Sequence, residues 1–78
     1  MMKDIIFQIV QALASTPDQV RVDEDRNQVG IVILQIVVAK TDLGKVIGQQ
    51  GRMITALRVI AKALNQDGLQ IKLRLKGT

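Results

Sequence analysis

The strongest structural signal in the chain is the apolar segment at residues 29–39. Most of its residues are Val or Ile, whose branched Cβ atoms restrict helical rotamers and pack well on a pleated sheet. The segment is long enough for one strand and too short for a long helix. We therefore predict a strand at the centre of a sheet, around which the remainder of this 78-residue chain must fold.

The residues before this strand predict a helix and a hairpin. A helix that packs against the sheet is expected within residues 1–15, and the apolar residues on its inner stripe are Ile5, Ile6, Ile9, Val10 and Leu13. This helix should end before Pro17, because proline disfavours helical geometry in the residue that precedes it. Alternation over residues 20–23 predicts a short strand, and the polar residues 24–28 should connect it to the central strand.

Two helices are expected after the central strand. Thr41 or Asp42 can cap a short first helix. The residues that should share one face of this helix are Leu43, Val46 and Ile47. The second helix is expected over about residues 52–65. Its inner stripe comprises Met53, Leu57, Ile60 and Leu64, with Ile54 and Ala61 beside them, and its outer face carries Arg52, Thr55, Arg58 and Lys62.

The last segment predicts a half-buried strand and completes the fold class. Residues 65–68 should end the second helix, and residues 69–76 then alternate between apolar and mostly basic side chains. The order is therefore helix, strand, strand, helix, helix, strand. We expect an α+β fold of one domain, residues 1–78, in which helices cover one face of a three-stranded sheet.

The absence of cysteine and histidine excludes most enzyme chemistry. It leaves no disulfide, thiolate zinc site, imidazole general base, or nucleophile activated by histidine. The acids at residues 23–25 are interpreted as solvated side chains, and no apolar run is long enough to cross a bilayer. We expect a soluble, non-enzymatic protein with no catalytic residue, metal, cofactor or membrane partner.

Charge is distributed unevenly along the chain. Eleven Lys and Arg residues against seven Asp and Glu residues give a net charge of +4. Residues 1–39 hold three bases and five acids, whereas residues 40–78 hold eight bases and two acids. This asymmetry predicts a surface in the second half of the chain that faces a polyanion.

The junction between the two expected helices carries a glycine pair, Gly48 and Gly51, around two glutamines. Glycine lets the backbone approach a ligand without interference from a Cβ atom, and the start of a helix presents unpaired amides and a partial positive charge. Lys45 and Arg52 add a cation on each side. This arrangement can hold phosphates, and adjacent apolar groups can then hold bases.

Other interpretations of the glycine pair fit less well. A Walker-type loop that starts at Gly44 needs glycine at position 49, followed by lysine and a hydroxyl residue, and these are absent. A dinucleotide fingerprint needs glycine at position 46 and a strand directly before it. A simple helix–helix turn, in which Gly51 relieves strain, remains open as a structural alternative.

Residues 47–54, with the sequence IGQQGRMI, resemble the I-G-x-x-G-x-x-I core of the KH domain, whose GxxG loop clamps four nucleotides of a single strand. The extra helix and strand precede this core, as in the type II, prokaryotic form. The whole chain resembles the small bacterial single-KH proteins of the KhpA family. This resemblance implies a cytoplasmic RNA-binding protein that acts as an RNA chaperone or regulator, with a second, larger KH-containing protein as a partner.

The resemblance also implies a set of RNA-binding residues. They are Gly44, Lys45, Ile47, Gly48, Gln49, Gln50, Gly51, Arg52, Ile54, Thr55 and Arg58. Family members commonly carry a lysine within the loop, whereas both tip residues are neutral glutamines here. We expect weaker binding and a flatter dependence on salt, because each phosphate-neutralising cation steepens that dependence.

Two alternatives to RNA binding through the loop remain open. The first is a protein-interaction module, since both faces of residues 29–39 are apolar while helices can cover only one. Either the stems of Lys72, Arg74 and Lys76 shield the other face, or a second copy forms a weak homodimer there. The second alternative is single-stranded DNA, because discrimination depends on contacts to the 2′-hydroxyl.

Overall fold

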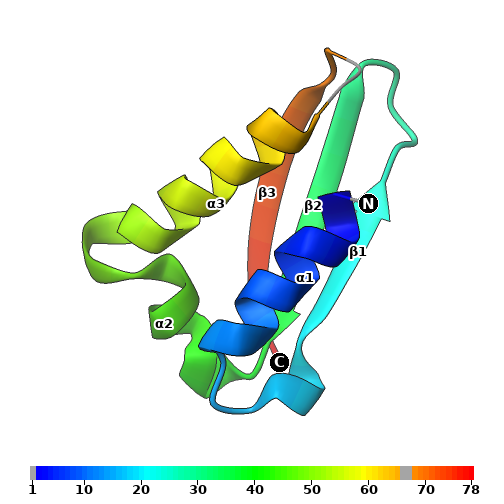
Figure 1. The fold of residues 1–78 in the computed structure, drawn as a ribbon. Coiled ribbons are helices and arrows are strands. Elements are labelled where there is room, and N and C mark those ends of the chain that lie inside the picture. The colour runs from blue at the N-terminus through cyan, green and yellow to red at the C-terminus, as the bar shows by residue number, and fades with distance from the viewer. Residues whose placement is uncertain (1, 66–67) are drawn as a thin grey trace.

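The computed structural model describes residues 2–65 and 68–78 of the chain. The helices and strands are α1 (Met2–Leu13), β1 (Arg21–Asp25), β2 (Ile31–Val38), α2 (Leu43–Ile47), α3 (Arg52–Leu64) and β3 (Gln70–Gly77). Three short 3-10 turns connect them: η1 (Pro17–Gln19), η2 (Lys40–Asp42) and η3 (Gln49–Gly51). The predicted order of elements is confirmed (Figure 1). Of the turn expected at residues 65–68, Gln66 and Asp67 lie outside the described residues.

The three strands form one mixed sheet in the order β1-β2-β3. β1 is antiparallel to β2, whereas β3 is parallel to β2 and follows it through α2 and α3. The prediction that residues 29–39 lie at the centre of the sheet is confirmed, although Val29 and Gly30 belong to the turn before β2. β1 also runs two residues further than predicted, because Glu24 and Asp25 pair with Leu34 and Ile33.

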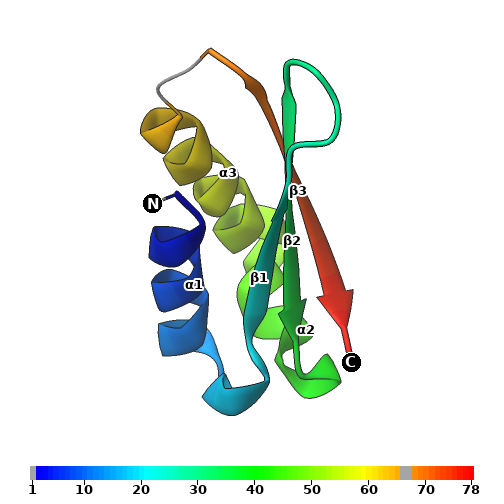
Figure 2. The same cartoon turned by 90° about the vertical axis from the view of Figure 1, so that its right-hand side faces the viewer.

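The helices lie on one side of the sheet and leave its other side uncovered (Figure 2). On the helical side, the side chains of Val32, Leu34, Ile36 and Val38 are fully buried. They pack with Ile6 and Val10 of α1, Val46 of α2, and Leu57 and Ala61 of α3. Full burial of one such aliphatic side chain stabilises the fold by about 1.5–3 kcal/mol. The predicted stripe of α3 is therefore confirmed in full as part of the core, whereas on α1 the core includes Ile6, Ile9 and Val10 but not the predicted Ile5 and Leu13.

The start of α2 differs from the prediction. Neither Thr41 nor Asp42 caps this helix with its side chain. Because η2 continues directly into α2, Asp42 already has helical backbone angles of φ −96° and ψ −4°. A capping residue normally has extended backbone. The Asp42 side chain is instead buried and directed toward the end of α1.

The predicted shared face of α2 is also wrong in one residue. Val46 is fully buried and Leu43 packs against the core, but Ile47 is 41% exposed. Ile47 is the last residue of α2, where the chain departs toward the glycine loop. Within residues 2–65 and 68–78, no helix has the length and apolar character needed to cross a membrane.

Candidate nucleic-acid interface

The loop at residues 48–51 has a backbone that glycine makes accessible. Gly48 has φ 78°, and a Cβ atom added there would lie 2.7 Å from the Met53 Cβ and 2.8 Å from the Met53 amide nitrogen. Any other residue would therefore clash with the first turn of α3. Gly51 also has a positive φ, 75°, but faces open space. The close approach at Gly48 is a structural reason for glycine that the sequence alone did not reveal.

Gln50 shares the unusual conformation of its neighbours. With φ 57° and ψ 26° it lies in the left-handed region, the only non-glycine residue with positive φ among the described residues. This conformation costs an ordinary L-residue about 1–2 kcal/mol. The Gln50 side-chain oxygen accepts a hydrogen bond from Arg52 at 3.4 Å. The tip of the loop is thus held in a strained turn whose two glutamine side chains are exposed.

Arg52 and the start of α3 provide the positive charge next to this turn. Arg52 is the first residue of α3, and its amide donates to the Gln49 carbonyl. Its side chain is exposed. The partial positive charge at the start of a helix adds to the guanidinium charge. A phosphate at this position would therefore meet both a fixed dipole and a cation.

Lys45, the second predicted cation, has a structural role as well. Its ammonium group donates to the Ser15 hydroxyl oxygen and lies 3.9 Å from a carboxylate oxygen of Asp42. About half of its side chain is exposed. Lys45 therefore links α2 to the end of α1, and its charge is partly compensated by Asp42.

Asp42 is the centre of this link. Its two carboxylate oxygens accept hydrogen bonds from the backbone amides of Ser15 and Thr16, each at 3.0 Å. These two hydrogen bonds, Thr16 first, and the nearby Lys45 ammonium lower the pKa of Asp42 below its ordinary value of 3.8. Sequence analysis missed this role, because the bonded residues are 26 and 27 positions apart. The Asp42 carboxylate therefore fixes the base of the arm formed by α2, the loop and α3 to the segment that follows α1.

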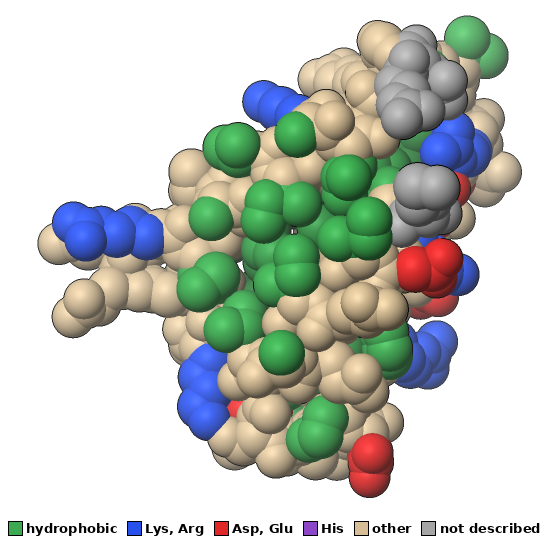
Figure 3. Space-filling model, in the orientation of Figure 1, with side chains coloured by type: hydrophobic (Ala, Val, Ile, Leu, Met, Phe, Trp, Pro, Cys, Tyr) green, Lys and Arg blue, Asp and Glu red, His purple; other side chains and the backbone are tan. Residues whose placement is uncertain are grey.

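The remaining predicted site residues lie on the same arm. Gly44 is exposed on α2, Ile47 is exposed at its end, and Ile54 is half-buried in the first turn of α3. Thr55 and Arg58 are exposed on α3. All eleven predicted site residues therefore belong to α2, the loop and α3. In Figure 3 the end of this arm projects on the left and carries a basic side chain.

Comparisons with known proteins identify the family of this chain. The family model described as KhpA/KhpB, KH domain, matches residues 3–76. A Clostridium acetobutylicum protein named RNA-binding protein KhpA is 44% identical over 62 residues, which are 80% of this chain and 81% of the relative. No solved structure gives a significant match.

More distant relatives extend the similarity over nearly the whole chain. Proteins with the same name from Chlamydia trachomatis and Thermotoga maritima are each 32% identical, over 75 and 74 residues. The alignments cover 95% of this chain in both cases, and 95% and 97% of the relatives. With its helix and strand before the glycine-loop core and its mixed sheet, the chain belongs to the KhpA/KhpB family of KH domains.

Proposed function

We propose that this protein is a non-enzymatic, cytoplasmic RNA-binding protein that holds single-stranded RNA in its GxxG loop. The observation that carries the proposal is the loop itself. Its backbone at Gly48 packs directly on the first turn of α3, so the loop and the positive end of that helix form one surface. The relatives are named RNA-binding proteins, which supports the same function for this chain.

Phosphate groups would be held by backbone and charge together. The glycines keep Cβ atoms away from the sugar-phosphate chain, and Arg52 stands at the start of α3 with its side chain in solvent. Lys45 precedes the loop on α2, and its ammonium is shared with Ser15 and Asp42. Such contacts position a strand without recognising its sequence.

Bases would contact the apolar residues beside the loop. Ile47 is 41% exposed next to Gly48, and Ile54 is half-buried in the first turn of α3. Phe7, the only aromatic residue, lies on α1 and packs against the core, so it offers no stacking platform near the loop. Aliphatic contacts and a neutral loop tip predict weak binding with limited sequence preference.

The test is a charge change at the loop tip. Gln49→Asp together with Gln50→Asp places two negative charges where phosphates should lie, and should abolish retention of labelled oligouridine. The matched control is Gln8→Asp with Gln28→Asp, which changes net charge equally at exposed positions on α1 and the β1–β2 turn. Equal RNA affinity for the two variants, both folded by circular dichroism, would refute binding through the loop.

The same loop could take single-stranded DNA, and competition between matched RNA and DNA strands tests this alternative. Equal competition would make the protein a general single-strand binder. We also propose an RNA chaperone or regulatory role with a second, larger KH-containing protein. Strand-annealing assays with and without the family's second KH protein test this part, and unchanged annealing rates would contradict it.

A second candidate function is protein interaction, favoured by an apolar surface on the helices. Val59 of α3 is 62% exposed, and Ala56 and Ala63 are exposed on the same helix. Figure 3 shows hydrophobic side chains gathered over α1 and α3. A second copy of the chain could cover this surface and form a homodimer through the helices, whereas the homodimer expected from the sequence used the uncovered face of the sheet. Light scattering of the wild type and Val59→Glu tests it, since a monomer in both cases would contradict dimerisation.

A further inference from the structure

The uncovered face of the sheet carries three adjacent rows of different chemistry. Strand register and alternation place side chains from each strand on this face. The β3 row is Lys72, Arg74 and Lys76. The β2 row is Ile31, Ile33, Gln35 and Val37. The β1 row is Arg21, Asp23 and Asp25. The face is therefore basic at one edge, mainly apolar in the middle and mainly acidic at the other edge.

The β3 row is a regular line of exposed cations. Lys72, Arg74 and Lys76 are all exposed, and no ion pair or hydrogen bond joins their side chains to any part of the chain that the structure describes. Side chains on one face of a strand recur about every 6.6 Å. A line of evenly spaced, unneutralised cations suits a ligand whose negative charges also recur along a line, as phosphates do in an extended nucleic-acid strand.

The β2 row lies next to these cations and can contact bases. Neighbouring β-strands are about 4.8 Å apart. A single-stranded nucleic acid with its phosphates on β3 would therefore place its bases over β2. Ile33 and Val37 are half-buried and offer apolar contact, while Gln35 between them offers an amide. A glutamine amide can form two hydrogen bonds with adenine, and a carboxylate such as that of Asp23 can accept a hydrogen bond from the amino group of cytosine.

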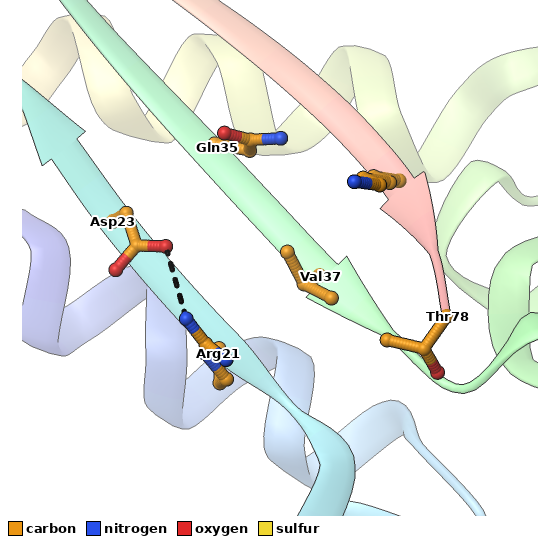
Figure 4. Close-up of a pocket in the computed structure, with 6 residues that line it drawn as sticks. Arg21, Asp23, Gln35, Val37 and Thr78 are labelled. Atoms are coloured by element: carbon orange, nitrogen blue, oxygen red, sulfur yellow. Dashed lines mark ion pairs between the residues drawn. The ribbon is translucent and has the colours of Figure 1, made fainter.

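One end of the uncovered face contains a pocket that could accommodate part of a ligand. The pocket encloses about 330 Å³ and is lined by Arg21, Asp23, Gln35, Val37, Lys76 and Thr78. Figure 4 shows the Arg21–Asp23 ion pair on β1 beside Gln35 and Val37 on β2. Arg21 Nη2 lies 3.8 Å from Asp23 Oδ2, so the charge of Arg21 is partly neutralised. Lys76 has no ion-pair partner among the described residues. The pocket thus combines an unpaired cation, an amide and an apolar wall.

We infer that the uncovered face is a second contact surface for single-stranded nucleic acid, with phosphates on β3 and bases over β2. β3 is an edge strand, and α2 and α3 both pack against it. A nucleic-acid strand that leaves the glycine loop can therefore pass around the β3 edge onto the uncovered face of the sheet. This inference extends the proposed function to longer single-stranded ligands. It depends on the proposed binding at the loop only in assuming that one ligand contacts both surfaces.

A second copy of the chain fits this face less well. A two-fold axis parallel to β2 would place Asp23 and Asp25 against Arg74 and Lys72, but it would also place Arg21 against Lys76. An axis across the strands would set the two β3 rows against each other. Ile31, Ile33 and Val37 are already half-buried, which leaves little apolar area for a stable interface.

The test compares a short and a long oligouridine by fluorescence anisotropy. The face variant is Lys72→Gln with Arg74→Gln, and its matched control is Lys3→Gln with Arg26→Gln, which lowers net charge equally. For a strand of about 16 nucleotides, the face variant should bind roughly tenfold more weakly than the control, with a salt slope flatter by about 1.4. A tetranucleotide should bind both variants alike, since it fills only the loop.

Two outcomes would overturn the inference. The first is equal affinity and salt slope of the face variant and its control for the long strand. The second is a wild-type dimer in light scattering that the face variant alone converts to monomer, which would assign the face to a second copy. The loop variant Gln49→Asp with Gln50→Asp separates the two proposals. If only the loop proposal is wrong, binding of the long oligonucleotide still depends on Lys72 and Arg74. If only the face proposal is wrong, the wild type and the face variant bind the tetranucleotide and the long oligonucleotide equally well.

Discussion

The glycine loop and the β3 row are two basic surfaces that differ in how they are built. The loop has only two adjacent cations, one of them shared with Asp42, but its backbone adopts a conformation that few residues allow. The β3 row has three unneutralised cations on an ordinary strand. Nucleic-acid binding by the loop should therefore depend on backbone shape, and binding by the β3 row should depend on charge. Different substitutions should abolish binding at each surface.

The largest effect is expected from a change of shape in the loop. Gly48→Ala places a Cβ atom 2.7 Å from that of Met53 and forces a side chain into a positive φ. We expect a loss of stability of about 1–3 kcal/mol and loss of tetranucleotide binding. Urea unfolding and anisotropy measure the two effects.

Gly44→Ala is the matched control for this change. Gly44 lies in α2 with open space around its position, so alanine should stabilise the helix by about 0.5–1 kcal/mol. If the two alanine variants had the same stability, the close contact between Gly48 and Met53 would not be a constraint on the fold.

Asp42 provides the next test, because it anchors the loop arm and not the β3 row. Its pKa is lowered by hydrogen bonds from Thr16 and Ser15, so its carboxylate stabilises the folded state when ionised. This contribution is complete above the unfolded-state pKa of about 3.8 and is lost as pH falls through the lower folded-state pKa. Asp42→Asn should therefore be less stable than wild type near neutral pH and approach it in acid.

Unfolding in urea at about pH 7 and about pH 3 measures this difference. The amide resonances of Ser15 and Thr16 should also shift in Asp42→Asn, since they lose a charged acceptor. A stability difference that does not change with pH would mean that the carboxylate charge has no part in the link.

A smaller effect is expected from adding charge to the loop tip. Gln50→Lys keeps the shape of the turn and places a cation beside the phosphate path, so the salt slope for a tetranucleotide should steepen by about 0.7. Gln8→Lys adds the same charge on an exposed part of α1 and is the control. Equal slopes for both variants would place the Gln50 side chain away from phosphates.

The smallest effect is expected from relieving strain in the loop. Gln50→Gly removes the cost of a left-handed L-residue, about 1–2 kcal/mol, but adds freedom to the unfolded chain. The net change in stability should be below about 1 kcal/mol and stabilising. A clear destabilisation, measured by urea unfolding, would show that the Gln50–Arg52 hydrogen bond outweighs the strain.

Much of the fold was predictable because its signals are local. The inner stripe of α3 and the alternation in β3 are periodicities that a window of a few residues contains, and both are confirmed. The end of α1 before Pro17 is likewise a local effect of proline geometry. Strand boundaries at β1 and β2 differ from the prediction by one or two residues. The errors in side-chain placement include Asp42 and Ile47, where the direction of a side chain depends on which distant element packs beside it.

The candidate site divides in the same way. The sequence indicated the GxxG loop and its neighbours, but not the contact between Gly48 and Met53 or the link from Lys45 to Ser15. It also left the function of Lys72, Arg74 and Lys76 open between solubility and binding. Their alignment beside Ile33 and Val37 depends on the register of β3 with β2.

By itself, the amino-acid sequence determined the type of each element, the central place of β2, and the family to which the glycine loop points. Only the tertiary structure decided that Asp42 holds the end of α1 and that basic, apolar and acidic rows lie side by side on the open face. The physical reason is that periodicity is encoded among near neighbours, whereas strand register and the crossover through α2 and α3 join residues that no local pattern connects.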